Sequence, residues 1–217
     1  MSRLAALTCF GALLLAQGRL HAQVTATAPG AEATQYTPRW DLYGGAQYAH
    51  FNPGTGHGNQ VAANNLLGWN ATATVWLHPS WGIDASVRGV YGNLRVAPNR
   101  FGIPLRPPMS EHLVLFGPDF RVVRTVRYAV GFHALIGAAY GDFSSGFPPN
   151  TYPQMVDMYN TKLAFGMGVG PSIDYNVTPR WSVRVIPDWL STHYGFSFQN
   201  EFAGSIGLVY RIGSLSK

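Results

Sequence analysis

The chain has 217 residues, and only 12% of them are charged. A typical soluble domain carries about 25% charged residues, so this composition argues against an ordinary soluble domain. The formal net charge of +5 is spread along the chain rather than gathered in a basic cluster, and the chain is expected to be exported, so we predict no nucleic-acid partner.

The N-terminal segment has the pattern of a secretory signal peptide. Arg3 supplies a positive charge, residues 4–16 form an apolar run, and a short polar stretch follows. This run is too short to cross a bilayer as a helix. We predict that residues 1–22 are the signal peptide, with cleavage after Ala22 or, alternatively, after Ala26. The single cysteine, Cys9, lies within this segment, so the secreted chain is expected to contain no disulfide bond.

The remainder of the chain is predicted to be one β-barrel domain, residues 39–217. Residues 23–38 are rich in Ala, Thr and Pro and lack apolar periodicity, so we expect a disordered N-terminal lead-in there. Beyond it, segments in which polar and apolar residues alternate are separated by turn-rich stretches. The predicted strands are residues 39–51, 65–77, 81–92, 111–122, 128–141, 161–175, 181–191 and 199–212.

The connections between these strands alternate in length. Residues 78–80, 123–127 and 176–180 form short turns, whereas residues 52–64, 93–110, 142–160 and 192–198 form longer loops. Short turns on one side and long loops on the other are typical of outer-membrane barrels, in which the turns face the periplasm. An even strand count places both termini on that side. The sequence therefore predicts an all-β protein, an eight-stranded antiparallel up-and-down transmembrane β-barrel.

Aromatic residues begin every second predicted strand. Trp40, Trp81 and Trp181 each follow a proline by two positions, and Tyr128 begins the fifth strand. Rings at one height around a barrel are what an interfacial aromatic girdle requires. Tryptophan-capped hairpins in a soluble β-protein would produce the same repeat, and this alternative remains open.

Charged residues within the strands share one face of each strand. Asp84 and Arg88 alternate with Ile83 and Val87, for example. A lipid-facing charge at mid-bilayer costs roughly 2 to 4 kcal/mol, so the charged face should be the lumen. A soluble lipocalin-type barrel would reverse the faces, but glycines fall on the charged face, as a narrow lumen requires. The predicted lumen charge network is Asp41, Asp84, Arg88, Asp119, Arg121, Lys162, Asp174, Arg184, Asp188, Glu201 and Arg211, and we expect its ion pairs to fill the barrel.

Four segments resemble a known group of proteins. Residues 164–175, 181–188 and 202–212 are similar to the last three strands of the small bacterial outer-membrane β-barrel superfamily that includes OmpA-like transmembrane domains, and residues 41–45 resemble its opening strand. The resemblance implies an architecture, a location in the cell outer membrane and handling by the outer-membrane assembly machinery. Family members commonly end on an aromatic residue that this machinery reads, whereas Ile212 holds that approximate place here.

The same patterns contain few candidates for a catalytic or cofactor site. Ser191 and His193 share a face near the outer rim, as His and Ser do in lipid A deacylases, but the nearest acid, Glu201, has the opposite parity. His133 is interpreted as a hydrogen-bonded lumen residue rather than a metal ligand. The glycines at 166–170 continue a strand instead of preceding a helix, which argues against a nucleotide loop. We predict no catalytic residue, cofactor or metal.

These observations favour an integral outer-membrane protein with a structural or surface-interaction role and no catalysis. A small passive porin-like channel is the alternative, and a lipid A-modifying enzyme is a third. The long loop at residues 93–110 carries Arg95, Arg100 and Arg106, which we expect to contact lipopolysaccharide phosphates. Predicted partners are therefore outer-membrane lipid, lipopolysaccharide and the assembly machinery. The sequence gives no indication of oligomeric state.

Overall fold

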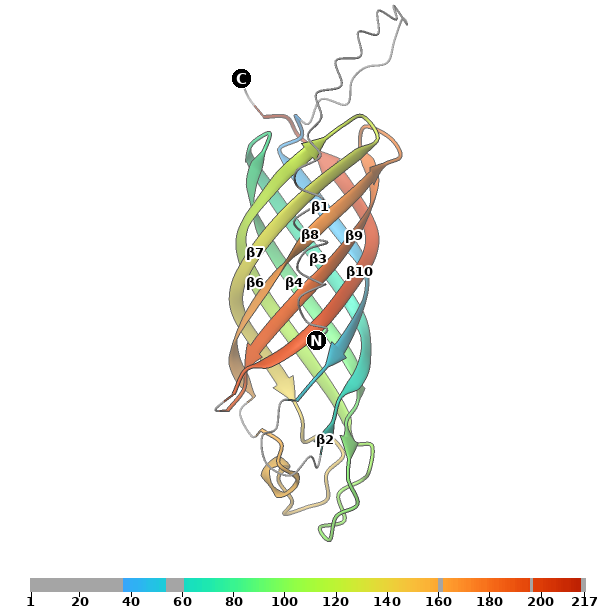
Figure 1. Ribbon diagram of the computed structural model, residues 1–217, viewed down its shortest axis with the longest axis vertical. Coiled ribbons are helices and arrows are strands. Elements are labelled where there is room, and N and C mark those ends of the chain that lie inside the picture. The colour runs from blue at the N-terminus through green and yellow to red at the C-terminus, as the bar shows by residue number, and fades with distance from the viewer. Residues whose placement is uncertain (1–36, 54–60, 160–161, 196, 216–217) are drawn as a thin grey trace, which may run out of the picture. The chain divides into compact units, whose positions relative to one another are not determined.

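The computed structural model describes residues 37–53, 61–159, 162–195 and 197–215. Within them, eight long strands close into an antiparallel barrel (Figure 1). These strands are β1 (Trp40–Phe51), β3 (Asn64–His78), β4 (Trp81–Asn93), β6 (Pro108–Arg124), β7 (Tyr128–Asp142), β8 (Leu163–Asn176), β9 (Trp181–His193) and β10 (Gln199–Ile212). Strand β1 pairs with both β3 and β10, so the barrel has no open edge. The predicted fold class is confirmed.

The predicted N-terminal features lie almost entirely outside the described residues. This holds for the signal peptide, residues 1–22, and for the lead-in, residues 23–38, of which only the last two are described. The barrel strands run from residue 40 to residue 212. None of the helices in the described chain is long and apolar enough to cross a membrane.

Three short elements lie in the long connections, where the sequence analysis expected none. Strand β2 (Val61–Ala62) pairs with β5 (Arg95–Val96), and a 3₁₀ helix, η1 (Pro153–Val156), lies between β7 and β8. Figure 1 shows the connections that carry β2 and η1 at the opposite end of the barrel from the short turns. Strand β6 also begins at Pro108, earlier than predicted, because a proline is accommodated at the first position of a strand.

Alternation of buried and exposed residues confirms which face of each strand is the lumen. In β4, Asp84 and Arg88 are buried, whereas Ile83, Val87 and Tyr91 are 42 to 47% exposed. The buried charged residues therefore face the interior and exposed apolar residues form the exterior, the reverse of a soluble barrel. This arrangement contradicts the lipocalin-type alternative.

Glycine allows close contact between neighbouring strands at specific lumenal positions. A Cβ atom added at Gly68 would overlap the carbonyl oxygen of Gly89 on β4, and one at Gly117 would overlap that of Ala134 on β7. No side chain fits at either position without displacing backbone. The packing of neighbouring strands at these two positions thus depends on glycine.

Candidate functional site

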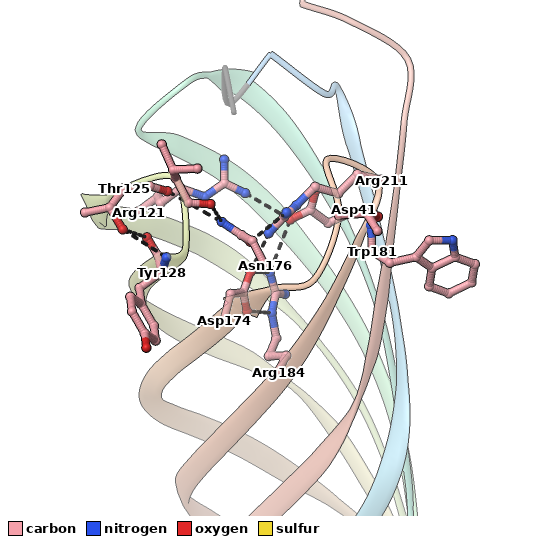
Figure 2. Close-up of polar contacts among 11 residues, drawn as sticks. Asp41, Arg121, Thr125, Tyr128, Asp174, Asn176, Trp181, Arg184 and Arg211 are labelled. Carbon is pink, nitrogen blue, oxygen red and sulfur yellow. Dashed lines mark hydrogen bonds and ion pairs between the residues drawn. The ribbon is translucent and has the colours of Figure 1, made fainter. Parts of the chain in front are cut away.

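The part of the lumen nearest the short turns holds a network of ion pairs (Figure 2). Arg184 lies at its centre, with Nε 2.6 Å from Asp174 Oδ1 and Nη2 3.1 Å from Asp41 Oδ2. Arg121 Nη2 donates to the same Asp41 oxygen at 2.9 Å, and Arg211 Nη2 donates to Asp174 Oδ2 at 2.9 Å. All five residues are at most 5% exposed. Because they come from five different strands, their pairing joins the walls across the lumen.

This network is also tied to the turn between β6 and β7. Arg211 donates to Asn176 Oδ1 at 2.9 Å, and Asn176 Nδ2 donates to the carbonyl oxygen of Val126 at 3.0 Å. The guanidinium of Arg121 lies over the ring of Trp76, 3.7 Å from its centre. Buried charges are tolerated only when they are paired and hydrogen-bonded, and these contacts supply those partners.

A second group of charged residues also lines the lumen. Arg88 pairs with Asp188, and Asp188 Oδ1 lies 2.9 Å from His133 Nε2. Asp84 and Asp119 are buried in the same lumen, at 3% and 1% exposed, without an ion-pair partner among the residues that the structure describes. His133 is thus a lumen residue in contact with a carboxylate.

The inclusion of Lys162 in the lumen network was wrong. Strand β8 begins at Leu163, and Lys162 lies in the preceding connection, where it is exposed. Its backbone carbonyl still accepts a hydrogen bond from Gly141 at 2.8 Å. An ammonium group at the strand end remains hydrated at no cost, whereas burial in the lumen would need a paired carboxylate.

Glu201 lies in the lumen but has no cationic partner among the described residues. Instead it faces a second buried acid, Glu111 of β6, and the two are 1% and 0% exposed. Glu111 also lies within reach of Thr192 and Tyr194, yet none of these side-chain oxygens forms a hydrogen bond of good geometry. Burial raises the pKa of the Tyr194 phenol, which lies just beyond β9. Sequence reasoning missed Glu111, although its parity in the predicted strand matches that of Asp119.

Mainly apolar side chains fill the half of the lumen nearest the long loops, which also contains the buried acids Glu111 and Glu201. The cluster includes Phe51, Leu66, Val90, Leu113, Leu115, Leu135, Ala139, Leu190 and Ala203. Small residues on β7 and β8 leave room for it: Leu115 would be 3.4 to 3.5 Å from a Cβ atom placed at Gly166 or Gly168, and Leu190 would be 2.9 Å from one at Gly168. The ion pairs therefore fill only one end of the barrel, and a hydrophobic core fills the other.

Residues from the long connections cover this hydrophobic core. The ring of Phe143 lies 6.0 Å from that of Phe51 and 5.0 Å from that of Tyr194, measured between ring centres. Val156 of η1 and the nearby Met158 are also buried in the cluster. At the other end, the gap beside Trp76 and Arg121 is too narrow to hold a water molecule. Among the described residues, side chains therefore occupy both ends of the lumen.

The predicted girdle residues lie outside the barrel at the short-turn end. Trp40, Trp81, Tyr128 and Trp181 are the first residues of β1, β4, β7 and β9 and are 41 to 51% exposed. Figure 2 shows Trp181 pointing away from the ion pairs. Their placement at a membrane interface stays a prediction.

The remaining residues identified in the sequence, which are the catalytic candidates and the loop arginines, lie in different parts of the barrel. Ser191 is 2% exposed, and the His193 ring packs edge-on against Phe198 with 4.5 Å between ring centres. No hydrogen bond joins Ser191 to His193 in the described structure. Of the three loop arginines, Arg95 and Arg106 line one cavity, whereas Arg100 lies over the ring of Phe101 at 5.3 Å.

A closed antiparallel barrel with inward-facing charges and an apolar exterior is the fold of an integral outer-membrane protein. Solved structures of small outer-membrane barrels share it. Neisserial surface protein A has a TM-score of 0.58 at 9% identity, over 80% of this chain and 97% of that protein. OprG from Pseudomonas aeruginosa has a TM-score of 0.53 at 12% identity, over 83% and 99%. The attachment invasion locus protein Ail of Yersinia pestis has a TM-score of 0.52 at 15% identity, over 81% and 99%.

No protein-family model matches the chain, and no curated protein matches it in sequence. The structural likeness at these identities establishes the fold. The chain is an outer-membrane β-barrel, and its apolar exterior places it in the cell outer membrane.

Proposed function

We propose that this protein is a closed outer-membrane barrel that acts structurally or through its surface loops, without catalysis. The observation that carries the proposal is the filled lumen. Ion pairs centred on Arg184 fill one half, and an apolar core around Leu115 fills the other. An eight-stranded barrel has an interior just wide enough for side chains, so a filled lumen leaves no path for solutes.

The long-loop end supports a surface role. Phe143, Val156 and Met158 anchor the connection between β7 and β8 in the core, while Tyr152 of the same connection is 55% exposed. Leu105, in the connection after β4, is 54% exposed. A loop with an anchored base and an exposed large side chain presents a contact surface of fixed shape.

Conductance in a planar bilayer tests the closed lumen. The detergent-folded full chain, shown to be folded by its heat-modifiable mobility on gels, should give little or no steady current. Stable, large single-channel openings from the unmodified protein would favour the porin-like alternative.

A second experiment tests the absence of catalysis. Outer-membrane vesicles from a producing strain and from a deletion strain should contain lipid A of the same mass. A lipid A species that changes its acyl chains only in the producing strain would instead support the enzyme alternative.

A further inference from the structure

A cavity of about 310 Å³ lies where β3 and β4 meet the connection that follows β4. This volume lies at the lower end of the range for small-molecule sites, about 300 to 1,000 Å³. The cavity is at the long-loop end, which in outer-membrane barrels faces the cell exterior. Its lining comes from the ends of β3 and β4 and from this connection, so a ligand there does not depend on whether the barrel conducts.

Two arginines lie directly opposite each other at this cavity. Leu94 N donates to Pro107 O at 2.9 Å, and Val96 N donates to Leu105 O at 3.0 Å, so the two arms of the connection pair in antiparallel register. This register places Arg95 opposite Arg106, and both line the cavity. Like charges directly opposite each other on paired strands are destabilising. Neither arginine forms an ion pair with another described residue, so an anion between them would relieve the repulsion.

Asparagine amides complete the polar part of the cavity. Asn93 Nδ2 donates to the carbonyl oxygen of Arg106 at 3.2 Å, which fixes that arm of the connection. Asn65 Oδ1 accepts a hydrogen bond from the Tyr48 hydroxyl at 2.9 Å, so its amide nitrogen is the end that remains to donate to a ligand. Guanidinium groups and amide donors together are the groups that bind phosphate oxygens.

The opposite edge of the cavity is apolar and belongs to the lipid-facing wall. Leu67 and Tyr91 are cross-strand neighbours on β3 and β4, and they are 68% and 45% exposed. The cavity therefore extends from two cations on the loops to the surface that contacts lipid chains. A free anion would use only the cationic edge, whereas a phosphorylated lipid would use both.

We propose that this cavity binds the phosphate group of a lipid in the outer leaflet, with the phosphate between Arg95 and Arg106 and the adjoining acyl chain against Leu67 and Tyr91. Arg100 takes no part in it, because its guanidinium lies over Phe101. Of the three arginines expected from the sequence to contact lipopolysaccharide phosphates, only Arg95 and Arg106 are therefore proposed to bind the phosphate.

Native mass spectrometry of the detergent-folded full chain tests the site with four probes. These are bisphosphorylated lipid A, lipid A freed of its phosphates, the deacylated bisphosphorylated disaccharide, and inorganic phosphate. The unmodified protein should bind bisphosphorylated lipid A more tightly than any of the others. Equal binding of dephosphorylated lipid A would remove the phosphate from the proposal, and equal binding of the disaccharide or of inorganic phosphate would remove the lipid.

Matched variants locate the site on the protein. Arg95→Gln/Arg106→Gln should weaken binding of bisphosphorylated lipid A about tenfold or more, equivalent to about 1.4 kcal/mol, and should reduce its salt dependence. Arg100→Gln, in the same connection, should leave the affinity little changed. All three side chains are exposed, and retained heat-modifiable mobility checks that each variant folds. Equal losses in the two variants, or no loss in the double variant, would overturn the proposal.

Discussion

Arg184 is the residue whose removal tests most directly how the lumen is held together. Its guanidinium donates to Asp174 Oδ1 at 2.6 Å, to Asp174 Oδ2 at 2.9 Å and to Asp41 Oδ2 at 3.1 Å. Removing one partner from a buried ion pair costs about 3 to 5 kcal/mol. Asp41 keeps Arg121, and Asp174 keeps Arg211, so we expect Arg184→Ala to lower the free energy of unfolding by about 3 kcal/mol, the low end of that range.

A second variant separates the lost charge from the lost volume. Arg184→Met removes the guanidinium but leaves a long, adaptable apolar side chain in the lumen. Both variants should unfold at lower urea concentration than the unmodified protein in lipid vesicles, because both leave Asp41 and Asp174 with fewer donors. Only Arg184→Ala should also raise ion leak in a planar bilayer. An unchanged urea midpoint for Arg184→Ala would refute the view that these ion pairs stabilise the barrel.

Three further substitutions test the lipid-facing surface, the buried acid pair and the glycine contacts between strands. Val185→Arg on the lipid face should destabilise the membrane-folded protein by about 2 to 4 kcal/mol. Val126→Arg, in a short turn, should leave the stability unchanged. Urea unfolding in lipid vesicles measures both effects. Glu201→Gln should raise the urea midpoint at neutral pH, by about 1 kcal/mol in free energy. Two buried carboxyl groups side by side cannot both ionise, and an amide can be buried beside Glu111 without taking up a proton. A loss of stability would contradict this explanation. Gly117→Ala should lower the free energy of unfolding by about 1 to 3 kcal/mol, because its methyl group would overlap the backbone of β7. Gly166→Ala, whose nearest neighbours would be 3.5 Å away, should lower it clearly less. Equal urea midpoints for the two variants would count against close strand contact at Gly117.

The sequence was sufficient to predict the strands and their lumenal face, but not the pairing across the lumen. Alternation identifies Arg88 and Asp188 as inward-facing because each is flanked by apolar outward residues. It cannot show that they meet, since they lie on β4 and β9, which are not neighbours in the barrel. That contact depends on strand tilt and stagger, which no local pattern records. Arg184, on the same face of β9 as Asp188, pairs instead with Asp174 and Asp41.

The apolar half of the lumen was missed for a related reason. In β6, residues 113–116 are Leu, Val, Leu and Phe, so the two faces carry the same kind of side chain and the pattern does not distinguish core from lipid contact. The structure distinguishes the two faces, because Leu113 and Leu115 are at most 1% exposed, whereas Val114 and Phe116 are 57 and 58% exposed. Charged residues in the sequence therefore identify the lumenal face only in the strand segments that contain them.

The charged half and the mainly apolar half of the lumen hold different parts of the fold together. Ion pairs near the short turns join strands to one another, whereas the apolar core near the long loops joins strands to connections, because Phe143 and Val156 belong to the same cluster as Leu115. Loss of packing in that core would therefore alter the external surface as well as the barrel. In a protein whose lumen conducted, such anchoring would obstruct the channel entrance; in one that acts through its surface, it holds the contact residues in place without further ordering on binding.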